Sequence, residues 1–143
     1  MLSSTLVFIQ FFVIFLMILP LGQETRYFEF GMFFMVLGAI IGILALLKNK
    51  LGNFNIRPDI KDDCILVTDG IYGYIRHPMY TSVLTIMFGF AFMYLSWYEV
   101  VLYLVLLVNL LIKMFYEEKL WHCEGEEYLE YTKGTARLIP FIF

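Results

Sequence analysis

The sequence has 143 residues, of which 61% are hydrophobic and 16% are charged, whereas a soluble globular domain is about 45–50% apolar and about 25% charged. A chain of this size buries only about 60–70% of its surface on folding, so lipid has to cover the remaining apolar area. The net charge of −3 is mild and gives no indication of a nucleic-acid partner. Cys64 and Cys123 are far apart and lack metal-ligand spacing, so we expect two reduced thiols and no metal site.

Four apolar stretches follow one another along the chain. A bilayer core of about 30 Å requires about 20 apolar residues in a helix. Stretches of this kind run from about Thr5 to Leu21, from Phe28 to Leu47, from Pro78 to Leu95 and from Tyr98 to Leu120. They predict an all-α integral membrane bundle of about four transmembrane helices, with residues 1–143 forming one domain.

The second stretch contains Gly38 and Gly42, a GxxxG spacing that allows another helix to approach closely. Packing within the chain and dimerisation explain this spacing equally well, so the oligomeric state stays open.

Basic residues predict the orientation. With four spans both termini share one side, and only Arg26 falls on the other side. The remaining basic residues share the side of the termini: Lys48, Lys50, Arg57, Lys61, Arg76, Lys113, Lys119, Lys133 and Arg137. The positive-inside rule therefore places both termini, the segment 48–77 and the tail 121–143 in the cytoplasm.

The first candidate cluster lies where segment 48–77 enters the third helix. A glycine-containing turn delivers Arg76 and His77 to the start of this helix, whose free N–H groups and positive dipole attract a carboxylate or phosphate. Tyr72 and Tyr80 supply aromatic faces for stacking or for a cation–π contact. Interfacial anchoring is the alternative, because these residue types are common where a helix leaves the bilayer.

The second cluster is Asn109, Lys113 and Glu117, whose spacing of four places them on one face of the fourth helix. A charge at the bilayer centre costs about 2.5–3.5 kcal/mol, so such residues face a partner or a polar cavity. Alternatively, Lys113 and Glu117 lie near the helix end and extend to the interface, and Asn109 bonds to a neighbouring helix.

The third cluster is the tail, in which Tyr128 and Tyr131 would share one face of a short amphipathic helix. This pattern fits a segment that lies on the membrane surface. It fits equally well a lid that folds back over a pocket.

The run Leu66-Val67-x-x-Gly70-x-Tyr72-x-x-x-Arg76-His77-Pro78-x-Tyr80 resembles the signature of the isoprenylcysteine carboxyl methyltransferases and related membrane methyltransferases. The tail, with Gly125-Glu-Glu-Tyr-Leu-Glu-Tyr131 and the ending Ile139-Pro-Phe-Ile142, resembles the C-terminus of the same family. The two matches keep the family order across about residues 52–143.

The resemblance implies an S-adenosylmethionine (SAM) enzyme whose site lies at the cytoplasmic membrane face. The cofactor-binding residues that it implies are Cys64, Ile65, Leu66, Val67, Tyr72, His77, Pro78, Met79, Tyr80 and either Glu117 or Glu118. The candidate catalytic residues are Lys113 and Arg137. Lys113 occupies a position where the family has an arginine associated with the substrate carboxylate, and a lysine cannot form the same planar clamp.

The expected reaction is methyl transfer to a lipophilic acceptor that enters from the bilayer, with a prenylated cysteine carboxylate as the nearest family substrate. A phospholipid amine or a small thiol is the alternative acceptor. Two other classes stay open, namely a sterol-reductase-like enzyme that uses NADPH and a non-catalytic membrane scaffold.

Overall fold

The computed structural model describes residues 2–19, 24–49, 66–124, 126–140 and 142–143. These residues contain five α-helices, one short 3-10 helix and no strand, so the prediction of an all-helical fold is confirmed for them. In chain order the elements are α1 (Leu2–Ile18), α2 (Phe28–Lys48), η1 (Gly70–Gly73), α3 (Pro78–Tyr94), α4 (Trp97–Glu124) and α5 (Glu126–Gly134).

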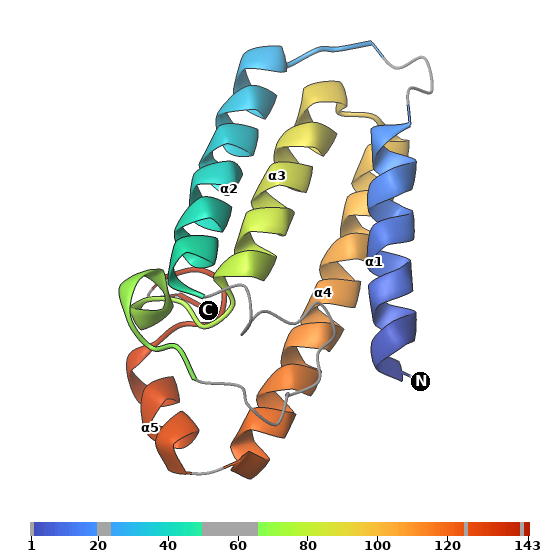
Figure 1. The fold of residues 1–143 in the computed structure, drawn as a ribbon. Coiled ribbons are helices and arrows are strands. Elements are labelled where there is room, and N and C mark those ends of the chain that lie inside the picture. Colours follow the sequence, from blue (N-terminus) through green and yellow to red (C-terminus); the bar gives the residue numbers. More distant parts are fainter. Residues whose placement is uncertain (1, 20–23, 50–65, 125, 141) are drawn as a thin grey trace.

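The four long helices stand side by side (Figure 1). Helix α2 packs along α3, α1 packs along α4, and α3 joins the two pairs through its contacts with α4. Both termini, η1 and α5 lie at the same end of this bundle, which we call the α5 end. The opposite end carries the α1–α2 connection and the α3–α4 turn, where Leu95 has a left-handed backbone with φ 44°.

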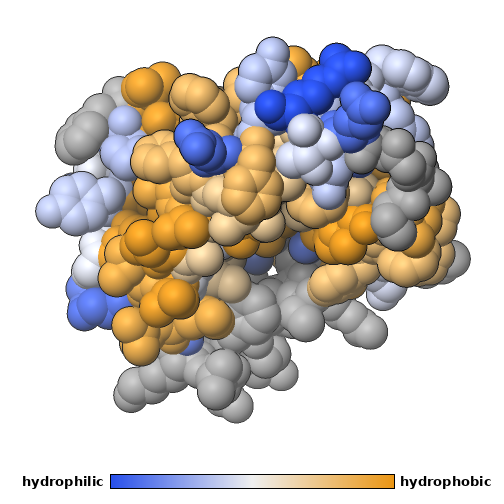
Figure 2. Space-filling view, turned by 90° about the horizontal axis from the view of Figure 1, so that it is seen from above, coloured by the Kyte–Doolittle hydropathy of each residue, from blue (hydrophilic) through white to orange (hydrophobic). Residues whose placement is uncertain are grey.

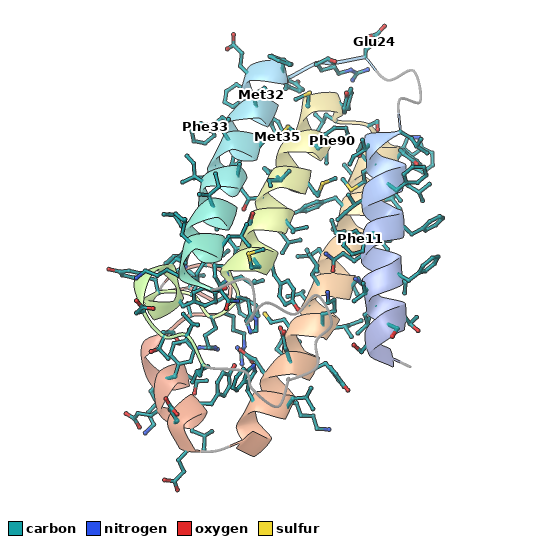
Figure 3. All side chains as sticks on the ribbon, in the orientation of Figure 1. Phe11, Glu24, Met32, Phe33, Met35 and Phe90 are labelled. Carbon is teal, nitrogen blue, oxygen red and sulfur yellow. The ribbon has the colours of Figure 1, made fainter. Side chains whose placement is uncertain are left out.

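Among the described residues, two helices are long and apolar enough to cross a membrane, namely α2 and the part of α4 from Trp97 to Trp121. Helices α1 and α3 are apolar but have only 17 residues each, so four spans remain a prediction. Large apolar side chains cover the outside of the bundle. Phe33 projects away from the neighbouring helices and is 62% exposed (Figure 3). Seen from the end opposite α5, hydrophobic residues form much of the visible surface, with several hydrophilic residues among them (Figure 2).

Small residues allow α2 and α3 to approach each other closely. A Cβ atom on Gly38 would lie 2.8 Å from the backbone nitrogen of Ile86, and one on Gly42 would lie 2.6 Å from Oγ of Ser82. The Ser82 hydroxyl donates a hydrogen bond of 2.7 Å to the carbonyl oxygen of Gly38. The GxxxG spacing therefore serves packing within the chain in this structure.

Helix α4 continues four residues beyond its expected end at Leu120, and most of the predicted tail forms α5. Tyr128 is the buried residue of α5, while Leu129 beside it is 43% exposed. The tail is therefore folded against the α5 end of the bundle by its aromatic face.

Candidate functional site

Polar side chains gather at the α5 end of the bundle, where nitrogen and oxygen atoms become frequent among the sticks of Figure 3. The chain reaches this region through η1, which begins at Gly70 with φ 61°, a backbone conformation that favours glycine. Helix α3 then starts at Pro78, a position where the missing N–H of proline costs no hydrogen bond. The turn and the helix start place Arg76 and His77 directly before α3.

The C-terminal segment pairs with this turn along its backbone. Ile75 and Ala136 form an isolated parallel bridge. The N–H of Arg76 donates to the carbonyl oxygen of Ala136 at 2.8 Å, and the N–H of His77 donates to that of Arg137 at 3.0 Å. Residues about 60 positions apart in the sequence are thereby held in register, so the two motifs of the family resemblance form one unit.

Glu118 joins two arginines from these paired segments. Its Oε1 accepts from Nε of Arg76 at 3.0 Å, and its Oε2 accepts from Nε of Arg137 at 2.9 Å. The Arg76 and Glu118 side chains are only 7% and 6% exposed, whereas that of Arg137 is 37% exposed. Arg76 also donates to the carbonyl oxygen of Thr135. We call Arg76, Glu118 and Arg137 the arginine clamp, because they fasten the C-terminal segment to α3 and α4.

Glu117, the adjacent residue on α4, shares His77 with Glu118, whose Oε1 lies 3.5 Å from Nε2 of His77, but Glu117 has no arginine partner among the described residues. Its Oε2 lies 3.5 Å from Nδ1 of His77, and its side chain is 21% exposed. Its charge also acts on Tyr72, Tyr80 and Lys113. Four predicted site residues, Tyr72, His77, Tyr80 and Lys113, therefore lie near one carboxylate, and we call these residues and Glu117 the Glu117 cluster.

The carboxylates of Glu117 and Glu118 shift the pKa values of neighbouring side chains that lie outside the apolar helices. Burial alone would lower the pKa of His77, but the adjacent Glu117 and Glu118 outweigh burial and raise that pKa above its usual value of 6.5. Burial, followed by the charge of Glu117, raises the pKa of the Tyr72 hydroxyl. The two adjacent acids thus favour the protonated form of His77, and its ring stacks on Tyr80 with centroids 5.5 Å apart.

Lys113 lies deeper between α1 and α4 and is only 1% exposed, so it is covered by protein instead of extending to the interface. Its Nζ donates to Oε1 of Gln10 at 2.6 Å and lies 5.3 Å from the centre of the Tyr80 ring. Asn109 donates to the carbonyl oxygen of Leu6 at 3.1 Å, which is the neighbouring-helix bond considered for it. Sequence patterns did not identify Gln10 as a partner of Lys113, because its only signal was a single amide side chain inside an apolar helix.

The other predicted residues divide into three groups. Pro78 is fully buried at the start of α3, while Leu66, Val67 and Met79 are half-buried. Cys64 and Ile65 lie outside the described residues.

Two tyrosines of α5 turn inward, toward the site. The hydroxyl of Tyr131 donates to the carbonyl oxygen of Tyr72 at 2.6 Å, and the ring of Tyr128 stacks on Trp121 with centroids 5.8 Å apart. Burial raises the pKa of both tyrosines, so their hydroxyls stay neutral at physiological pH.

Comparison with protein families matches residues 26–122 to the phospholipid methyltransferase family, and this match covers more than half of the chain. The chain therefore belongs to the phospholipid methyltransferase family, which is part of the isoprenylcysteine carboxyl methyltransferase-like group of membrane methyltransferases. Comparison with curated proteins finds no match. The matched region includes α2, α3, nearly all of α4, His77 and both glutamates, but it excludes Gln10 and the C-terminal segment with Arg137.

Proposed function

We propose that this protein is a multi-pass membrane enzyme that transfers a methyl group from SAM to a lipophilic acceptor at the cytoplasmic face. The observation that carries the proposal is the Glu117 cluster, in which a partly exposed carboxylate lies 3.5 Å from His77 and acts electrostatically on Tyr72, Tyr80 and Lys113. Membership of the phospholipid methyltransferase family supports the reaction type.

The chemistry of the Glu117 cluster fits this cofactor. SAM would supply an activated methyl group on a sulfonium, and it also carries an ammonium group. A carboxylate beside two aromatic rings provides ionic and cation–π contacts for such positive groups. Glu117 is better suited than Glu118 to receive them, because both oxygens of Glu118 are already engaged by arginines.

The residues around the reaction would act mainly by positioning. Lys113 is buried, held by Gln10 and close to Tyr80, so it could orient an anionic or polar acceptor group toward the Glu117 cluster. A carboxylate or thiolate acceptor is already ionised and needs no strong general base. Orientation of two reactants and exclusion of water then supply the main rate gain, which reaches roughly 7–11 kcal/mol in well-oriented pairs.

The acceptor is lipophilic in this proposal, because the exposed apolar surface of the helices is open to molecules dissolved in the bilayer. The family description favours a phospholipid amine, and the motif resemblance favours a prenylated cysteine carboxylate. Both candidate acceptors have a hydrophobic chain and a reactive head group at the membrane surface. The placement of both termini at the α5 end supports an even number of spans.

Calorimetric titration of SAM into the detergent-purified protein tests the proposal, with NADPH as the parallel ligand. We expect saturable binding of SAM, no binding of NADPH, and at least a tenfold loss of SAM affinity in Glu117→Gln. Glu127→Gln is the matched control, because it removes a carboxylate on the exposed side of α5. Labelled-methyl assays with prenylcysteine and phospholipid acceptors then identify the acceptor.

Binding of NADPH in place of SAM would replace the proposal by the reductase alternative. If the folded protein binds neither ligand, or if Glu117→Gln and Glu127→Gln bind SAM as the wild type does, the Glu117 cluster is not a cofactor site.

A further inference from the structure

A polar cleft lies on the side of α4 that carries Glu118. This cleft of about 580 Å³ is bounded by the turn before α3, α5 and the C-terminal segment, and its volume is within the usual range of small-molecule sites. Glu118 contributes to its lining, whereas Glu117 does not. The cleft is therefore distinct from the Glu117 cluster.

The lining of the cleft is basic. Arg76, Lys133 and Arg137 contribute three positive side chains and Glu118 contributes one negative side chain, so the net side-chain charge is +2. Lys133 is 70% exposed and pairs with Glu130, which is 75% exposed, so solvent screens this pair strongly. An anion that entered the cleft would meet an excess of positive charge.

Arg137 is prepared to bind an oxyanion. Its Nε is fixed by Glu118 at 2.9 Å, and its guanidinium lies 5.4 Å from the ring centres of both Phe115 and Phe143. Within the part of the chain that the structure describes, its two terminal nitrogens donate no hydrogen bond. A guanidinium held in one plane with two available donors matches the geometry of a phosphate.

Exposed apolar side chains belong to the same segments as this basic lining. Tyr74 is 62% exposed, Ile139 is 51% exposed, Ile142 is 78% exposed and Phe143 is 41% exposed. All except Ile139 also line the cleft. A basic lining next to exposed apolar side chains is complementary to a lipid whose phosphate enters the cleft while its acyl chains stay on those apolar side chains.

We propose that this cleft binds the phosphate of a membrane phospholipid, with Arg137 as the bidentate donor, Lys133 as a second cation and Ile142 in contact with the acyl chains. The site does not depend on the methyl-transfer proposal, because none of its lining residues belongs to the Glu117 cluster. It seats α5 and the C-terminal segment on the membrane surface.

The test is calorimetric titration of the full chain in detergent, without SAM, and with a blank titration into detergent alone. Three ligands separate the contributions: dihexanoyl phosphatidic acid, dihexanoylglycerol, which lacks the phosphate, and inorganic phosphate, which lacks the chains. We expect saturable binding of phosphatidic acid, at least tenfold weaker binding of phosphate, and no binding of dihexanoylglycerol.

Variants assign the binding to residues. Arg137→Lys keeps the charge but loses the planar fork, so we expect about tenfold weaker binding of phosphatidic acid. Lys133→Gln lies on an exposed surface and should weaken binding about threefold without affecting folding. Ile142→Ser should weaken the lipid but leave phosphate unchanged. Lys119→Gln removes an exposed lysine outside the cleft and should have no effect, and Glu117→Gln should bind phosphatidic acid as the wild type does.

Three results would overturn the proposal. If dihexanoylglycerol binds as tightly as phosphatidic acid, the cleft recognises only the chains. If inorganic phosphate binds as tightly as phosphatidic acid, the site takes a free anion and no lipid. If phosphatidic acid fails to bind the folded wild type, or binds the Arg137 and Lys133 variants unchanged, the cleft is not a phosphate site.

Discussion

Replacing Glu118 by glutamine preserves the size of the side chain but removes the negative charge that two arginines share. The Arg76–Glu118 pair has an N–O distance of 3.0 Å, and both side chains are at most 7% exposed. Loss of one partner from such a buried pair costs roughly 3–5 kcal/mol, because a buried charge stays uncompensated. The Arg137 side chain is 37% exposed, so solvent screens its ion pair with Glu118, and this pair contributes only about 0.2–1 kcal/mol of stability. We therefore expect Glu118→Gln to lose about 4 kcal/mol of stability.

Glu117→Gln is the matched control on the preceding residue. Its nearest described cationic atom is Nδ1 of His77 at 3.5 Å, and its side chain is 21% exposed, so we expect a loss of about 1 kcal/mol or less. Unfolding temperatures measured by near-UV circular dichroism in one detergent compare the two variants. At roughly 2–4 °C per kcal/mol, Glu118→Gln should unfold about 10 °C below the wild type and Glu117→Gln within about 4 °C.

The two variants also separate structure from binding. Glu117→Gln should lose SAM affinity with little loss of stability, whereas Glu118→Gln should show the stability loss even without ligand. If Glu117→Gln destabilises the protein as much as Glu118→Gln does, the division of roles between the two glutamates is wrong.

Three further predictions concern other parts of the bundle. Gln10→Leu removes the acceptor 2.6 Å from Nζ of Lys113 and should cost about 1–3 kcal/mol; a double-mutant cycle with Lys113→Met measures this, and additive losses would show that the two do not interact. The pKa of His77 is raised above 6.5, so its stabilising contribution is full below about pH 6.5 and disappears as the pH rises through the raised value; the difference in unfolding temperature between wild type and His77→Gln should therefore shrink from pH 6 to pH 9, and growth would contradict the sign. Gly38→Ala should cost about 1–3 kcal/mol by overpacking against the α3 backbone, whereas Gly134→Ala, whose Cβ would meet nothing within 4 Å, should be neutral by the same measurement.

Local patterns in the sequence were sufficient to predict the helices and the motif-bearing segments. The signals for the helices depend on neighbours along the chain: apolar runs of about 20 residues, the proline at position 78 and the glycine-containing turn before it. In agreement with them, α3 runs from Pro78 to Tyr94. The family motifs likewise pointed to Tyr72, His77 and either Glu117 or Glu118, and the fold brings His77 close to both glutamates. The spacing of polar residues on α4 left two possibilities for Lys113, a partner within the protein or extension to the interface, and the structure has it buried beside Gln10.

Tertiary packing decided what the sequence left open. Glu117 and Glu118 have the same chemistry and adjacent positions, and consecutive helical residues are turned by about 100°. Both carboxylates reach His77, but only Glu118 also reaches both arginines. Gln10 became a partner of Lys113 only because α1 packs against α4 across about 100 residues of sequence. The sequence by itself determined which residue types and helices are present, since these depend on neighbours along the chain, whereas the assignment of each charge to a partner depended on contacts between distant helices.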